Sequence, residues 1–157
     1  MNIRAATIDD VSTMVELSDT KRTQYAEYSP LFWRKAEGAS EKQTPFFKAQ
    51  VERENNIVLV YEESGKVEGF VIASLTTAPP VYDPGGQVCG VDDFVVSGPE
   101  RWHTVGEALL AEVKSQAKAR GAVLSVLVCG HLDEPKRDML RKIGFSIASE
   151  WYVNPIE

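Results

Sequence analysis

The sequence predicts one α/β domain in which helices cover both faces of a mixed sheet. The first observation is the order of periodic segments, which runs strand, two helices, three strands, helix, strand, helix and strand. The second is a hairpin pattern between residues 57 and 75, and the third is a strand at 91–96 that passes through a tight loop into a helix. Such elements pack as layers around a shared core, and 157 residues suit a single domain, 1–157.

The first part of the chain is predicted to form one strand and two helices. Ile3–Ala6 is a short strand. Thr7 and Asp10 stand at the spacing of a capping box, which predicts a helix running to about Tyr25. Thr44-Pro45 predicts the start of the second helix, because proline is favoured at the first helical position.

A hairpin and the strand–loop–helix unit make up the middle of the chain. Ile57–Glu62 and Val67–Leu75 flank the turn 63–66 and predict two antiparallel strands. A loop rich in proline and glycine follows at 76–86. The helix that opens at Glu107 is predicted to end at Gly121.

The last part of the chain is predicted to close the sheet. The apolar run Val123–Val128 is typical of a buried strand. Asp133-Glu134-Pro135 predicts a helix start, and Lys142 and Gly144 predict its end. We expect Phe145–Val153 to supply one or two closing strands.

Composition excludes several classes of function. A formal net charge of -6 argues against a nucleic-acid partner, which needs clustered Lys and Arg. No apolar stretch approaches the roughly 20 residues that span a bilayer, so we expect a cytoplasmic protein without a membrane partner. Two cysteines (Cys89, Cys129) and two histidines (His103, His131) show no spacing typical of metal ligands, and we predict no metal site.

The segment from Val96 to Gly106 carries the strongest functional signal. A strand followed by a tight loop and a helix start offers backbone N–H groups to an anion. The segment resembles the signature of the GNAT superfamily of acetyl-CoA-dependent N-acyltransferases, in which a strand ending in Val leads through a proline turn to Arg/Gln-x-x-Gly-x-Gly/Ala. Arg101, Val105 and Gly106 match that signature, whereas Thr104 replaces its middle glycine.

The element order of the whole chain is also that of the GNAT fold, a mixed, mostly antiparallel sheet. The resemblance implies acetyl-CoA as cofactor, and fourth and fifth strands that splay apart near Phe94 and Val126 to admit the pantetheine arm. It implies a cofactor site made by the loop amides, the Arg101 charge and the end of the fourth strand: Phe94, Val95, Val96, Arg101, Trp102, His103, Thr104, Val105 and Gly106. The alternative is an ordinary loop before a capped helix.

Asp92 and Asp93 interrupt an apolar strand, where an acidic side chain is costly unless it is hydrated or paired. Because side chains of a strand alternate between faces, only one of the two can point into a given cleft. The segment resembles the Glu-Asp-Phe-Phe-Val stretch of diamine N-acetyltransferases, which also carry counterparts of Tyr82-Asp83-Pro84 and Asp133-Glu134-Pro135. The resemblance implies that Asp92 draws a proton from the amine through water and that Asp93 attracts the cation. The alternative is an aspartate pair bonded to local backbone or an arginine.

The proton donor to the departing thiolate is the largest departure from the family. The usual Tyr of a Tyr-x-x-x-Gly-Phe pattern is Leu140 here. Water, Tyr82, Cys129 or His131 could replace it, or the thiolate could leave unaided. Cys129 and His131 also admit a covalent thiol–imidazole mechanism as an alternative.

Four aromatic residues between the first two helices, with Tyr82, are candidates for the acceptor pocket: Tyr25, Tyr28, Phe32 and Trp33. Core packing or a dimer contact is the alternative use of such rings. The resemblance implies direct transfer of an acetyl group, in a ternary complex, to a small primary amine such as a diamine, a polyamine or an amino acid. It also admits a homodimer, an acyl-CoA-binding sensor with little catalysis, and a protein N-acetyltransferase.

Overall fold

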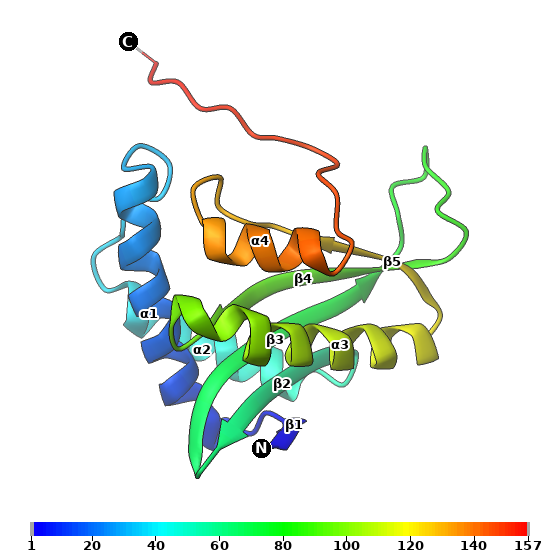
Figure 1. Cartoon of the computed structure of the whole chain (residues 1–157), viewed down its shortest axis with the longest axis horizontal. Coiled ribbons are helices and arrows are strands. Elements are labelled where there is room, and N and C mark those ends of the chain that lie inside the picture. The colour runs from blue at the N-terminus through cyan, green and yellow to red at the C-terminus, as the bar shows by residue number, and fades with distance from the viewer. Residues whose placement is uncertain (1, 157) are drawn as a thin grey trace.

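The computed structural model describes residues 2–156, which form one five-stranded sheet in the order β1-β2-β3-β4-β5 (Figure 1). The first four strands pair antiparallel, and β4 and β5 pair parallel. The mixed, mostly antiparallel sheet is therefore confirmed. Its strands are β1 (Asn2–Ala5), β2 (Asn56–Glu63), β3 (Lys66–Thr76), β4 (Gln87–Val96) and β5 (Ala122–Leu127).

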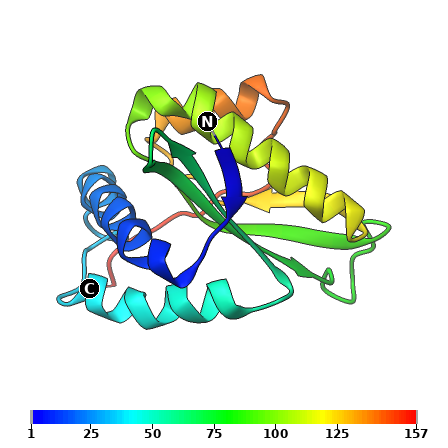
Figure 2. The same ribbon diagram turned by 90° about the horizontal axis from the view of Figure 1, so that it is seen from below.

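Helices cover both faces of this sheet, as expected (Figure 2). Helices α1 (Val11–Tyr28) and α2 (Ala39–Glu52) lie on one face, and α3 (Glu107–Ala119) and α4 (Glu134–Lys142) on the other. The period of two along the strands separates two cores. Val58 and Val60 pack with α1 and α2, whereas Ile57 and Leu59 pack on the side of α3 and α4.

The two amino-terminal helices differ in how well their starts were predicted. The Asp10 carboxylate accepts a bond of 2.7 Å from the Thr7 N–H, so the predicted capping interaction is present. Helix α2, however, begins at Ala39 and not at Thr44, which corrects the prediction. Pro45 lies inside the helix, which Phe47 holds against the sheet by burying its whole side chain. Packing outweighs the local preference of proline for a first turn.

The carboxyl-terminal prediction was wrong in two respects. Residues 145–156 form no strand, and after α4 the chain continues as an extended segment outside the sheet (Figure 1). Strand β5 is consequently the edge of the sheet and is not buried: Val123, Leu124 and Val126 are 48–55% exposed. The physical reason is that no segment of residues 2–156 pairs with the outer edge of β5.

Two irregularities of β4 shape the centre of the molecule. Its pairing with β5 ends at Val91↔Leu127, so the two strands separate beyond this point as expected. On the other side, Val91 pairs with Ala73 and Phe94 with Val71. Asp92 and Asp93 therefore lie together opposite Ile72, which is a β-bulge.

Candidate functional site

The loop between β4 and α3 places a helix start at the end of a strand. Strand β4 ends at Val96, a 3₁₀ turn covers Pro99–Arg101, and a wider π-type turn covers Trp102–Gly106 before α3 begins. The first turn of a helix has N–H groups without partners inside the helix and carries the positive end of the helix dipole. The arrangement suits an anion such as a pyrophosphate.

Trp102 fills the space beneath this loop. Its ring is buried and packs edge-on against Phe94, with 4.9 Å between the ring centroids. A Cβ atom added at Gly106 would lie 2.7 Å from the Trp102 ring, so position 106 needs glycine for this packing. The Trp102 side chain belongs to the core. A ligand at this position would therefore contact the main chain of the loop and not the Trp102 ring.

Two side chains of the loop already have partners. The Arg101 guanidinium lies 2.5 Å from the Glu63 carboxylate at the end of β2. The Thr104 hydroxyl is exposed and donates a bond of 3.3 Å to the Arg101 carbonyl oxygen. A phosphate bond from Arg101 would therefore compete with Glu63.

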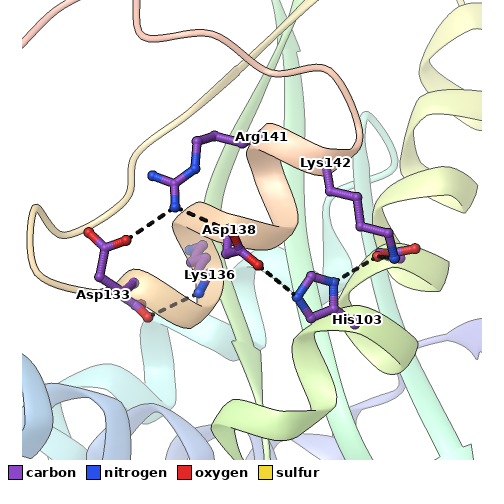
Figure 3. Close-up of polar contacts among 8 residues, drawn as sticks. His103, Asp133, Lys136, Asp138, Arg141 and Lys142 are labelled. Atoms are coloured by element: carbon purple, nitrogen blue, oxygen red, sulfur yellow. Dashed lines mark hydrogen bonds and ion pairs between the residues drawn. The ribbon is translucent and has the colours of Figure 1, made fainter.

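A shallow pocket of about 440 Å³ opens beside the loop. His103, Thr104 and Lys114 contribute polar groups to it, and Ile143 closes it after α4. The His103 ring lies 3.0 Å from Glu107 and 3.4 Å from Asp138 of α4 (Figure 3). Bonds from Lys142 and then from His103 lower the pKa of Glu107 below its usual range. These contacts tie α4 to the loop across one side of the pocket.

The predicted end of β4 contributes mainly backbone. Phe94, Val95 and Val96 are buried, with Val95 in the core of α1 and α2 and the other two in the opposite core. Val105 is fully buried as well. Any contact of these four residues with a cofactor would thus run through main-chain atoms.

Two lysine amines occupy the space where β4 and β5 separate. Lys21 Nζ, from α1, donates a bond of 2.8 Å to the Phe94 carbonyl oxygen. Lys136 Nζ, from α4, lies 3.4 Å from the same oxygen and 3.5 Å from the Val128 carbonyl oxygen. The Lys136 amine therefore joins the end of β4 to the residue that follows β5, beyond the end of their ladder.

Sequence reasoning missed this pair, although one signal was present. Lys136, Met139, Leu140 and Ile143 follow one another at helical spacing, and the last three form the apolar stripe of α4. A lysine in such a stripe buries its amine unless its long stem reaches water, and Lys136 is 1% exposed. Burial and the neighbouring Lys136 charge lower the pKa of Lys21 well below its usual value.

The aspartate pair lies beside these amines. Asp92 is exposed and Asp93 is half-buried, and neither side chain forms a hydrogen bond or ion pair with another residue of 2–156. Partial loss of water around the two carboxyls raises the pKa of both, and the Lys21 charge partly opposes the rise at Asp93. Within these residues, the alternative of a pair bonded to backbone or to an arginine is therefore not observed.

Four of the predicted acceptor residues gather between α1 and α2. Ring centroids are 5.6 Å apart for Tyr25 and Tyr28, 5.4 Å for Tyr25 and Trp33, and 4.6 Å for Phe32 and Trp33. Tyr82 is not with them. It is 72% exposed in the loop before β4, and that loop lies at the opposite end of the molecule (Figures 1 and 2).

Tyr25 also ties α1 to the start of α4. Its hydroxyl donates a bond of 2.7 Å to the Asp133 carboxylate and accepts one of 3.1 Å from the Gly130 N–H. Burial raises the pKa of Tyr25. Tyr25 is thus a buried residue that links α1 to the start of α4. The rings of Tyr28, Phe32 and Trp33 are the more accessible part of the cluster.

The structure gives no support to the covalent alternative, because no hydrogen bond joins Cys129 and His131 within residues 2–156. Burial raises the pKa of the Cys129 thiol, which is the reverse of what a nucleophilic thiolate needs. His131 is exposed and its Nδ1 atom lies 3.5 Å from Arg137, not against the thiol. Leu140 is buried, as a leucine in the stripe of α4 should be.

Other classes of site are not found in the described part of the chain. Residues 2–156 contain no group of three or more His, Cys, Asp or Glu side chains placed to hold a metal ion. None of the described helices has the length and apolar character needed to cross a membrane.

Comparison with known proteins settles the family. A family model described as the acetyltransferase (GNAT) family matches residues 20–145. The chain belongs to this GNAT acetyltransferase family. It is 26% identical, over 147 residues, to the uncharacterized N-acetyltransferase YhfO of Bacillus subtilis, with 92% of this chain and 89% of that protein covered.

Solved structures share the fold of this GNAT protein. A mutant of the BH1408 protein from Bacillus halodurans superposes with a TM-score of 0.86 at 19% identity, and the match covers 100% of both chains. A predicted acetyltransferase with acetyl-CoA from Clostridium acetobutylicum gives a TM-score of 0.74 at 18% identity, covering 98% of this chain and 95% of that one. These likenesses show that the chain has the GNAT fold.

Proposed function

We propose that this GNAT protein transfers an acetyl group from acetyl-CoA to a small primary amine, directly and in a ternary complex. The observation that carries the proposal is the turn Trp102–Gly106 near the amino end of the helical run that leads into α3, beside the 440 Å³ pocket that Lys114 also lines. These groups fit a pyrophosphate, because backbone N–H groups, a helix dipole and a cation all favour an anion. Bound acetyl-CoA would supply the activated acetyl group.

The proposal assigns proton uptake to the bulge of β4. Asp92 is exposed and can take a proton from the acceptor amine through water, while Asp93 attracts the ammonium form of the amine. A pKa raised by partial loss of water makes each carboxylate a stronger base than an ordinary aspartate, which suits proton abstraction. The bulge lets both side chains serve one region, which regular alternation would forbid.

The acceptor is proposed to be a cationic amine of the diamine or polyamine type. The aromatic cluster already accommodates one cation, because Lys21 Nζ lies 5.0 Å from the centroid of the Tyr25 ring. Tyr28, Phe32 and Trp33 extend this ring surface outward. We also propose a homodimer, because apolar side chains of β5 and of the carboxyl-terminal segment are exposed together.

One specific observation favours a second candidate, an acyl-CoA sensor with little catalysis. The Lys136 amine joins the end of β4 to the residue that follows β5 where the acetyl group would have to lie, so the side chain must move to admit it. Leu140 supplies no proton, and Thr104 stands where the family signature has a glycine.

A release assay separates these candidates. We expect thiol release from acetyl-CoA with at least one member of a panel of diamines, polyamines, amino acids and lysine peptides. Binding of acetyl-CoA measured by calorimetry, together with no release across the panel, would favour the sensor. Release with lysine peptides alone would replace the small amine by a protein acceptor.

A further inference from the structure

Lys21 and Lys136, the lysine pair, bring two amines together in a largely buried space without a carboxylate partner among the described residues. Lys136 and Lys21 converge on one carbonyl oxygen, and a buried ammonium is costly unless it is paired. The other charged and titratable groups near the pair are Arg22 and Tyr25 from α1, Asp93 from β4, and Cys129 and Asp133 from the segment leading into α4. Within residues 2–156, neither of these carboxylates forms an ion pair with either lysine.

Aromatic rings hold the two amines in place. Lys136 Nζ lies 5.1 Å from the centroids of both Phe94 and Trp102, and Lys21 Nζ lies 5.8 Å from that of Trp102. The faces of the rings stabilise a cation but offer it no proton acceptor. The two carbonyl bonds of Lys136 are long, at 3.4 and 3.5 Å, so its ammonium can still donate to an anion that enters the gap.

The position of Lys136 on α4 supplies the second argument. Lys136 and Leu140 are four residues apart and share one helix face, where the earlier side chain lies one turn nearer the amino end. A donor at position 136 can thus serve the same cavity as a donor at position 140. Lys136 also reaches the end of β4 and the residue that follows β5, which a leucine at 140 does not do by any polar contact.

We propose that Lys136 is the proton donor to the departing sulfur, in the place that Leu140 leaves empty. The inference rests on the proposed acetyl transfer. As the acceptor nitrogen forms its bond to the acetyl carbon, the carbon–sulfur bond breaks with its electron pair on sulfur, and Lys136 Nζ gives that sulfur a proton. The proton lost by the acceptor passes to the Asp92 carboxylate. Solvent then returns a proton to Lys136, and the products are an amide and a thiol.

Free coenzyme A tests this role without any acceptor. An ammonium beside the sulfur lowers the pKa of the bound thiol, so the wild-type protein should release protons as coenzyme A binds near neutral pH. Calorimetry in two buffers of different protonation enthalpy measures the number released. Desulfo-coenzyme A, which lacks the sulfur, should bind without this release.

Matched variants assign the effect to one lysine. Lys136→Met keeps the length of the side chain and should bind coenzyme A without releasing protons, whereas Lys21→Met should still release them. Adding Leu140→Tyr to Lys136→Met should restore thiol release from acetyl-CoA if the panel has identified an acceptor. Circular dichroism checks that each variant is folded.

The outcomes separate the inference from the proposed function. Binding of coenzyme A with equal proton release by the wild type and Lys136→Met, or with none by the wild type, overturns the role of Lys136 alone. No binding of coenzyme A or acetyl-CoA overturns the proposed function as well.

Discussion

Replacing Thr104 by aspartate is expected to weaken acetyl-CoA binding about tenfold or more, which is about 1.4 kcal/mol or more. The hydroxyl of Thr104 is exposed at the rim of the pocket, next to the helix start that would hold the pyrophosphate. A carboxylate there repels the phosphates and competes for the same N–H groups. Titration calorimetry with acetyl-CoA gives the change in affinity directly.

Thr104→Asn is the matched control, because it keeps the size and polarity of aspartate without its charge. It should bind acetyl-CoA nearly as well as the wild type. Substitution at Gly106 would be a poorer probe, since any side chain there meets the Trp102 ring and disturbs the core. Equal affinity for the Thr104→Asp and Thr104→Asn variants would show that the pyrophosphate lies elsewhere.

The sequence patterns correctly predicted those elements that depend on neighbouring residues in the chain. The hairpin around residues 63–66, the capping interaction of Thr7 and the strand–loop–helix unit each depend on residues adjacent in sequence. The buried position of β5 and the closing strands depended instead on a pairing between distant segments. An alternating pattern predicts that a segment can be a strand but does not identify its partner.

In the candidate site, too, features that depend on neighbouring residues were predictable, whereas contacts between distant segments were not. The helix start at the proposed cofactor loop follows from its turn residues and could be found in the sequence. The lysine pair could not be assigned in advance, because it depends on α1 and α4 meeting over β4. The two-residue alternation assumed for Asp92 and Asp93 failed because the bulge opposite Ile72 interrupts it.

Asp92→Asn is expected to lower turnover about a hundredfold or more once an acceptor has been identified, because an amide cannot take up the proton of the amine. Acetyl-CoA affinity should remain nearly unchanged, since Asp92 lies on the strand and not on the loop. The pH profile gives a second reading. Partial loss of water raises the pKa of Asp92, so the wild-type rate should fall, as pH decreases, at a higher pH than for an ordinary aspartate. This acid limb should disappear in the residual activity of the variant.

Asp93→Asn distinguishes the two aspartates through stability as well as rate. Burial is the main cause of the raised pKa of Asp93, so its ionised form costs stability. The protonated form of Asp93 favours the folded state. This contribution to stability is complete below the ordinary pKa of aspartate, and it is lost as pH rises through the higher pKa of Asp93 in the folded protein. Asp93→Asn should therefore raise Tm at neutral pH and change it little in acid. A larger loss of turnover in Asp93→Asn than in Asp92→Asn would make Asp93 the base, because the bulge would then direct that side chain at the amine.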